Sequence, residues 1–340
     1  MKRFLALHFI PLLAVFVSSC GISTGVVSFE TLEPATITLP GDTRNPVFIN
    51  RAPLSPNSLI TPTNEMLEMD DMIILDTMII NHLKKGINTI LDQQTMDFEN
   101  EPVWIDMRRQ DSSAFRQPLD MSFASGIFEN YHSDILFSLE NYAFKSKVKI
   151  EDPIESAYYY GEVSLSASFT WFAYLPEMDQ PFDTCTLSDT LYWWNWGLTA
   201  YEALKGENMP APTDMFREAS YLGGENYGWH ILPHWMPAER MIYQGNEEEF
   251  VTAANLTNHG QWEDAVAIWQ NLLNHEKKSV RGKAAYNLAV WYEMNDDLDQ
   301  ALAFAIQAAE NIRSDRFEMY IGLLRKRINN KNILKQQLSP

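Results

Sequence analysis

Two histidines, His230 and His234, have a spacing that can bind a metal ion. Residues four apart lie on one face of an α-helix, so their imidazole rings could hold zinc together. Pro233 lies between them and disfavours a regular helix. No glutamate follows the first histidine in the arrangement of zinc proteases. We therefore expect packed or exposed loop histidines here, and no metal site.

Three acidic residues, Glu177, Asp179 and Asp183, gather at a predicted turn. Carboxylate oxygens at a turn can hold calcium, but this spacing differs from that of an EF-hand loop. The flanking prolines suit an ordinary turn. The sequence also lacks the motifs of serine hydrolases, phosphate loops and dinucleotide-binding sites. We therefore expect no cofactor and no catalytic residue, and a non-enzymatic role.

The densest aromatic cluster in the sequence contains Trp193, Trp194 and Trp196, together with Tyr192 and Tyr201. Exposed tryptophans could stack on the sugar rings of a glycan. Alternatively, every second residue could be buried against a sheet, because tryptophan is usually mostly buried. Both interpretations remain open at the level of sequence.

A sheet is needed to position this cluster. Residues 162–171 alternate strictly between apolar and polar side chains, which predicts a strand with one covered face. Residues 184–194 are expected to return as its hairpin partner. Other predicted elements are strands at 35–39, 46–50, 103–107 and 134–142 and helices at 118–132 and in the second half of 70–92. The predicted fold class is α+β, with a mixed α/β sheet domain at 35–197 and an all-α domain at 198–335.

Helices are expected throughout the second domain. Residues 213–222 and 237–243 have helical patterns, and Gly223-Gly224 and Pro233 are expected to interrupt the chain between them.

Residues 250–312 align with themselves at a shift of 36. Each copy predicts two helices joined by a polar turn, at 258–260 and at 295–297. The pattern resembles the tetratricopeptide repeat, whose period is about 34 residues, although the usual proline after the second helix is missing. The resemblance implies a surface for a peptide or a partner helix. The candidate interaction residues on it are Trp262, Trp269, Trp291 and Tyr292.

The chain begins with a basic start and a 14-residue, mostly apolar stretch at 4–17, shorter than the roughly 20 residues that span a bilayer. The segment Val17-Ser18-Ser19-Cys20-Gly21 resembles the lipobox of bacterial lipoproteins. The resemblance implies a signal peptide at 1–19, lipid attachment at Cys20 and a lipidated tether at 20–34. The alternative is an ordinary secretory peptide with a chance cysteine.

The layout resembles a Bacteroidetes-type lipoprotein family of unknown function over nearly the full chain. The matching motifs are the lipobox, Asn50-Arg51, residues 134–140, the tryptophan-rich hairpin, residues 233–240, and Trp262 with residues 284–289. The resemblance implies no known chemistry. No acidic run follows Cys20, which favours the periplasmic side of the outer membrane over the cell surface.

A net charge of −19 argues against nucleic acid and against a surface that lies flat on anionic lipid. Cys185 is the second of two cysteines, so no intramolecular disulfide is expected once Cys20 is lipidated. We expect a membrane-anchored protein-interaction or assembly module with a protein partner in the cell envelope. Glycan or peptidoglycan binding by the aromatic cluster is the alternative.

Overall fold

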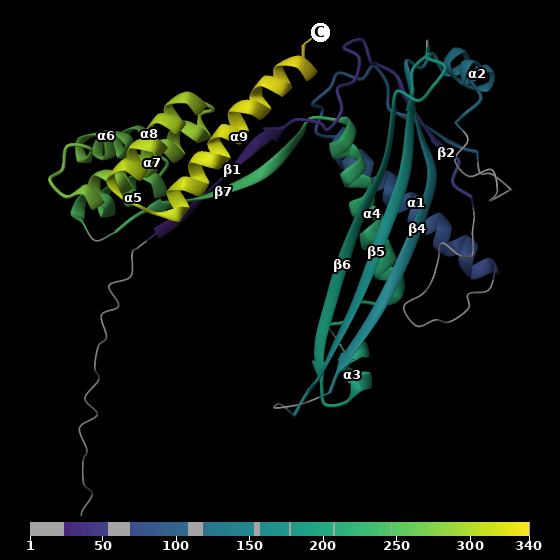
Figure 1. The fold of residues 1–340 in the computed structure, drawn as a ribbon, viewed down its shortest axis with the longest axis horizontal. Helices are drawn as coiled ribbons and strands as arrows, with labels where there is room; N and C mark the ends of the chain where they lie inside the picture. The colour runs from purple at the N-terminus through teal and green to yellow at the C-terminus, as the bar shows by residue number, and fades with distance from the viewer. Residues whose placement is uncertain are drawn as a thin grey trace, which may run out of the picture. The chain divides into compact units, whose positions relative to one another are not determined.

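The computed structural model describes residues 24–53, 69–107, 118–152, 157–176, 178–206, 208–245 and 247–339 (Figure 1). The predicted signal peptide, Cys20 and Glu177 lie outside these residues. The chain divides into two compact units, one made of residues 30–236 and 329–340 and the other of residues 1–29 and 237–328. The first part of the chain forms a mixed α/β sheet region and the C-terminal part is helical, which confirms the predicted α+β class at this coarse level.

The first unit, called the sheet unit here, contains a five-stranded sheet in the order β3-β2-β4-β5-β6. Its strands are β2 (Pro46–Asn50), β3 (Val103–Asp106), β4 (Ile135–Glu151), β5 (Tyr159–Tyr174) and β6 (Asp183–Gly197). β2 pairs in parallel with both β3 and β4. The long strands β4, β5 and β6 are antiparallel neighbours, so β6 forms one edge of the sheet.

The alternation in β5 determines which face of the sheet is covered. Odd-numbered residues from Val163 to Ala173 are buried, and the even-numbered residues between them are partly exposed. Because β6 continues the same alternation, its odd-numbered residues lie on the covered inner face and its even-numbered residues on the outer face. This pleat decides which side chains of the aromatic cluster are available to a ligand.

Two long helices, α1 (Met69–Leu91) and α4 (Pro212–Ile231), pack on the inner face and share its apolar core. They cross at glycines: a Cβ atom added at Gly86 would lie 2.0 Å from the carbonyl oxygen of Tyr221, and one at Gly224 would lie 2.0 Å from that of Leu83. Gly223 and Gly224 therefore lie inside a helix, and the expected break at this pair was wrong. Glycine was required for close helix packing and not for a turn.

Two shorter helices complete the sheet unit. α2 (Met121–Tyr131) is capped by the Asp120 side chain, which accepts a hydrogen bond from Ser122 N. Apolar residues of α2 pack with Val47, Ile49 and Leu136 on the outer face near β2. α3 (Ala200–Lys205) follows β6 directly.

β1 (Thr24–Glu33) and β7 (His234–Tyr243) form a two-stranded sheet, and the division between the two units falls within both strands. The helix expected at 237–243 was wrong. Residues 24–33, expected as part of a tether, are a strand, whereas the strand expected at 35–39 is irregular backbone. Residues 237–243 pair with β1, a strand far away in the sequence, and this distant pairing overrides their local helical pattern.

The second unit, called the helical unit here, contains two helix pairs and the start of a long last helix. The helices are α5 (Glu248–Asn258), α6 (Trp262–Leu272), α7 (Lys278–Met294), α8 (Leu298–Asn311) and α9 (Asp315–Gln337). α5 packs on α6, and α7 packs on α8.

The turns within the two pairs repeat at the spacing seen in the sequence. Gly260 and Asp296 both have positive φ angles, of 75° and 57°. The amides of Gln261 and Asp297 donate to the carbonyls of Leu256 and Tyr292. In each comparison the two equivalent residues are 36 positions apart, so the two turns repeat in the backbone at the spacing found in the sequence.

A buried ion cluster ties three elements of the helical unit together. The carboxylate of Glu293 is 1 % exposed and accepts two hydrogen bonds from Arg240, at 2.7 and 2.9 Å. Arg327 donates to it at 2.8 Å, and the hydroxyl of Tyr320 donates at 2.7 Å. Nearby, the side chain of Asn287 pairs with the backbone of Tyr243 in both directions. Every buried charge here has a partner, as burial requires.

The sheet unit extends to residue 236, past the domain boundary expected at 197, because α4 packs against α1 and the sheet.

No helix among the described residues is long and apolar enough to cross a membrane.

Candidate functional site

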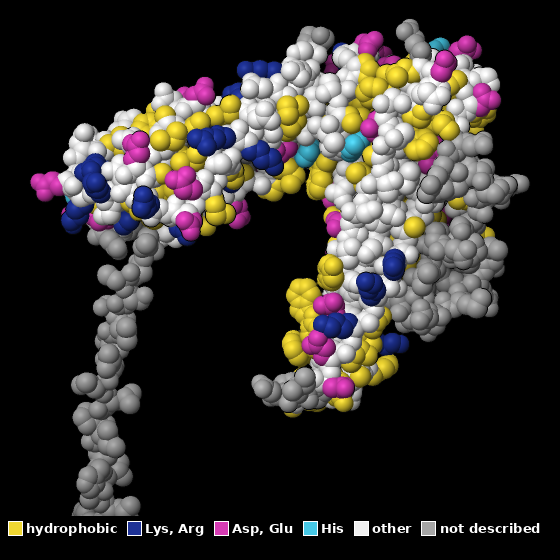
Figure 2. Space-filling view, viewed as in Figure 1, with side chains coloured by type: hydrophobic (Ala, Val, Ile, Leu, Met, Phe, Trp, Pro, Cys, Tyr) yellow, Lys and Arg dark blue, Asp and Glu magenta, His cyan; other side chains and the backbone are white. Residues whose placement is uncertain are grey.

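The outer face of β6 carries a row of exposed aromatic side chains, Tyr192, Trp194 and Trp196, called the aromatic row here. Their exposed fractions are 56, 58 and 58 %. Alternate residues on a strand point the same way and lie about 6.7 Å apart. Hydrophobic side chains gather over the C-terminal end of β6, next to α3 (Figure 2). Such an exposed apolar patch marks an interaction surface.

Polar side chains of β5 lie directly beside the aromatic row. The strand register places Ser164 opposite Tyr192 and Glu162 opposite Trp194. Tyr160 lies opposite Trp196, with ring centroids 5.0 Å apart. Glu162 accepts a hydrogen bond from the Tyr160 hydroxyl, which raises the pKa of Tyr160. The row therefore has hydrogen-bonding groups along its whole length.

Three lysines of β4 add positive charge to the same outer face. Lys145, Lys147 and Lys149 are exposed, and the last two lie opposite Ser164 and Glu162 in the register. Glu151 pairs with Lys149 and raises its pKa. In a chain of net charge −19, this is a local cationic column on the same face as the aromatic row, with β5 between the two.

The other predicted interaction residues are less accessible. Trp193 points to the inner face and packs against the core of the sheet unit. Trp269 is completely buried, while Trp262, Trp291 and Tyr292 are partly buried against the helical core. Tyr292 stacks on Phe304 with ring centroids 5.3 Å apart. Each of these rings therefore packs on the core of its own unit.

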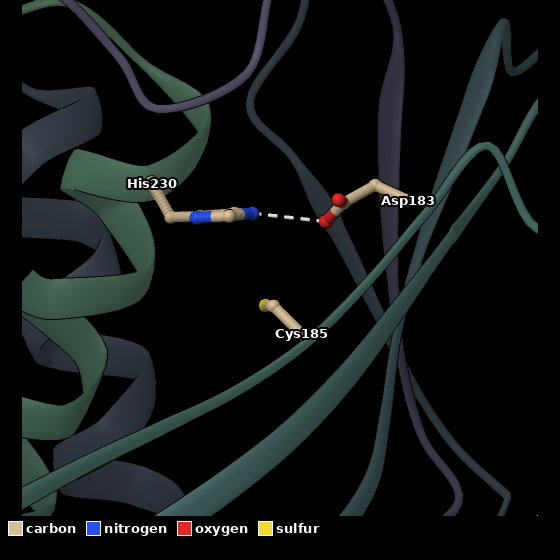
Figure 3. Close-up of side chains that lie close together, drawn as sticks. All are labelled: Asp183, Cys185 and His230. Atoms are coloured by element: carbon tan, nitrogen blue, oxygen red, sulfur yellow. Dashed lines mark hydrogen bonds and ion pairs between the residues drawn. The ribbon is translucent and has the colours of Figure 1, made fainter.

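A second cluster lies on the inner face, where the beginning of β6 meets the end of α4. Figure 3 shows Asp183, Cys185 and His230 directed toward one another. The Nε2 atom of His230 is 2.9 Å from a carboxylate oxygen of Asp183. One potential ligand atom from each of the three residues lies within 4.8 Å of the others. Among the described residues, this is the group of histidine, cysteine and acidic side chains that could hold a metal ion.

The thiol in this cluster is not activated as a nucleophile. Burial, and then the charge of Asp183, raises the pKa of Cys185 to about 12. A catalytic cysteine needs a lowered pKa, so that the thiolate is present at neutral pH. His230 is hydrogen-bonded to Asp183. The arrangement therefore does not support covalent catalysis by Cys185.

The two histidines considered from sequence have different surroundings in the structure, and so do Asp179 and Asp183. His234 lies at the start of β7, where its Nδ1 atom contacts the carbonyl oxygen of Leu232 at 3.1 Å and its ring stacks on Trp229. Asp179 is exposed in the turn, while Asp183 lies with His230. The sequence missed this grouping, although the same-face spacing of Asp183 and Cys185 was a usable signal.

Residues 100–243 match a domain of unknown function (DUF8603), and residues 251–335 match a second one (DUF6340). No curated protein matches this chain. Two domains of unknown function therefore make up most of the chain, in agreement with the expected family of unknown function.

Two solved structures are similar over part of the chain. One is a putative neuraminyllactose-binding hemagglutinin homolog from Helicobacter pylori, with 7 % identity and a TM-score of 0.28, covering 57 % of this chain and 88 % of that one. The other is the hypothetical protein CT253 from Chlamydia trachomatis, with 8 % identity and a TM-score of 0.27, covering 55 % and 96 %. At such low identities and TM-scores, neither name is transferred to this chain.

Proposed function

We propose that this protein is a non-enzymatic glycan-binding module of the cell envelope, with peptidoglycan as the polymer it contacts. The observation that carries the proposal is the exposure of the aromatic row, of which two members are tryptophans that are 58 % exposed. Burial of Trp194 and Trp196 would have removed glycan binding from consideration.

The surroundings of the aromatic row support a sugar ligand. Pyranose rings have an apolar face that stacks on an aromatic ring and hydroxyl groups at their edge. Ser164 and Glu162 lie beside the row and can bind such hydroxyls. The lysine column favours a glycan that carries carboxylates.

Membrane attachment is the other part of the proposal. The lipobox-like segment ending at Cys20 supports a lipid anchor in the outer membrane, facing the periplasm, where peptidoglycan lies within reach. One acyl chain holds a protein weakly, and two or more make the attachment stable.

The test is sedimentation of the protein with insoluble peptidoglycan, together with tryptophan fluorescence during titration with muropeptides. We expect the double variant Trp194→Ala/Trp196→Ala to bind at least about tenfold more weakly, a loss of about 1.4 kcal/mol. Trp235→Ala is the matched control, since Trp235 is also exposed on a strand, at 44 %, but lies outside the aromatic row. Equal binding by the double variant and the wild type would refute the proposal.

A second candidate is protein binding by the helical unit, whose paired helices resemble tetratricopeptide repeats. Met319 on α9 is 75 % exposed and Val251 on α5 is 48 % exposed, which favours it. A photo-crosslinking residue at position 319 should capture a single envelope protein, and Val251→Glu should abolish that crosslink. A crosslink that is unaffected by Val251→Glu would count against the repeat surface.

A further inference from the structure

We propose that Asp183, Cys185 and His230 form a binding site for a single zinc ion. This site is separate from the aromatic row, because Asp183 and Cys185 lie on the inner face of β6 and the row lies on the outer face. The three side chains come from one strand and one helix of the sheet unit (Figure 3).

The chemistry of the three groups selects zinc among common ions. A thiolate, an imidazole and one carboxylate are typical zinc ligands, whereas calcium and magnesium prefer several oxygen ligands. Three protein ligands leave a fourth tetrahedral position for a water molecule. On binding, zinc would displace the proton of the Cys185 thiol to solvent, since a coordinating thiol is deprotonated.

The distances are close to those a zinc ion needs. Ligand atoms around tetrahedral zinc lie about 3.5 Å apart, as follows from bonds of about 2.0–2.3 Å. His230 and Asp183 are already closer than this, at 2.9 Å, and the largest separation within the group is below 4.8 Å. Zinc binding would therefore require the ligand atoms to shift from these separations to the tetrahedral spacing. The side chain of His230 is 8 % exposed and that of Asp183 is 19 %, so the group reaches solvent mainly on its Asp183 side.

A second observation points to a missing ligand at the same place. Tyr227, one helical turn before His230, is completely buried, and its hydroxyl has no hydrogen-bond partner among the described residues. Its ring lies against the ring of His230, with centroids 6.0 Å apart, so the unpartnered hydroxyl belongs to a side chain that packs directly on this cluster. A buried hydroxyl without a hydrogen-bond partner is costly, because its hydrogen bonds to water are lost and not replaced. A water molecule bound to zinc in the fourth position would donate a hydrogen bond to the oxygen of that hydroxyl.

Neighbouring residues fix the C-terminal end of α4, which carries Tyr227 and His230. The ring of Tyr227 stacks on Trp171, with centroids 4.0 Å apart, and on the ring of His230. Trp171 lies opposite Cys185 in the β5–β6 register. The carbonyl oxygen of His230 accepts hydrogen bonds from the amides of Thr36 and Ile37, both at 3.0 Å. A preorganised frame of this kind is what a metal site needs.

Cobalt can replace zinc as a spectroscopic probe. We expect the chelator-treated full-length protein to bind one cobalt ion per chain with a thiolate-to-cobalt absorption band that zinc abolishes. Cys185→Ser should remove the band, and Asp183→Asn and His230→Gln should each weaken zinc binding at least about tenfold. Cys20→Ala and His234→Gln are the matched controls and should leave both signals unchanged.

A second measurement uses the unmodified protein and does not depend on folding of the variants. Zinc should slow alkylation of Cys185, measured by mass spectrometry of the peptide that contains it. The proposal is overturned if zinc leaves this rate unchanged, if the wild type binds no cobalt, or if the band persists in Cys185→Ser and disappears in Cys20→Ala.

Discussion

At the scale of single residues, the most demanding feature is the buried carboxylate of Glu293. Three side chains, Arg240, Tyr320 and Arg327, donate hydrogen bonds to it. Burial lowers the pKa of Arg240, but the hydrogen bond and charge of Glu293 more than offset this and raise it overall. The guanidinium therefore stays charged inside the helical unit.

Removing this carboxylate charge should destabilise the protein strongly. We expect Glu293→Gln to lower the free energy of unfolding by about 3–5 kcal/mol, because it removes the carboxylate partner of the buried Arg240 guanidinium and leaves Arg327 only its 3.6 Å ion pair with Asp296. Urea unfolding monitored by circular dichroism measures the change. Glu310→Gln, at an exposed position on α8, is the control and should change it by less than about 0.5 kcal/mol. Similar effects for the two variants would contradict the role assigned to Glu293.

A second residue, His234, should make stability depend on pH. Burial lowers its pKa from the usual 6.5, opposed by the hydrogen bond to Leu232 and by the charge of Glu33. The unfolded chain therefore binds a proton at a higher pH than the folded protein does. Stability is full above pH 6.5 and falls as the pH drops through that value toward the lower folded pKa.

The comparison variant is His234→Gln, which keeps an N–H donor for the carbonyl of Leu232 but does not titrate. Urea unfolding between about pH 7.5 and 5.5 should show a larger loss of stability for the wild type than for the variant. Parallel curves would show that His234 contributes nothing to the pH dependence. All other histidines, His230 included, are the same in both proteins, so the comparison isolates His234.

At the scale of elements, the crossing of α1 and α4 depends on backbone contact. A methyl group at Gly224 has no space, because the carbonyl oxygen of Leu83 lies 2.0 Å from the Cβ position. We expect Gly224→Ala to lower the free energy of unfolding by about 1–3 kcal/mol through overpacking. Gly322→Ala in α9 is the matched control, since nothing lies within 4 Å of its Cβ position.

The control substitution should act in the opposite direction. Alanine in a helix interior is favoured over glycine by about 0.5–1 kcal/mol, so Gly322→Ala should raise stability slightly. Thermal unfolding of the two variants side by side gives the comparison. Stabilisation by both substitutions would show that α1 and α4 can separate without cost.

At the scale of the whole molecule, the proposed lipid anchor would attach an acidic chain to a membrane. The net charge of −19 disfavours binding to anionic lipid, and no described helix could span a membrane. We expect Cys20→Ala to abolish metabolic labelling with a fatty acid and to leave the precursor uncleaved. Cys185→Ala should be labelled and processed normally, and is the control. Normal lipid labelling of Cys20→Ala would exclude the anchor.

The sequence alone determined the features that depend on local pattern. Period-two alternation predicted β5 and its hairpin partner β6, and the shift of 36 predicted both helix pairs and their turns. These patterns suffice because the residues that set them lie within a few positions of one another. The same alternation also places Trp194 and Trp196 on one face of β6, but the sequence left open which face is covered.

Only the tertiary structure decided the features that depend on distant partners. Residues 237–243 are a strand because β1 pairs with them, and Gly224 lies inside a helix because α1 crosses there. Likewise, Asp183 and His230 are 47 residues apart in the chain and meet only when α4 packs on the sheet. Local spacing paired His230 with His234, whereas the fold placed His230 beside Asp183 and Cys185, because burial against the sheet outweighs local propensity.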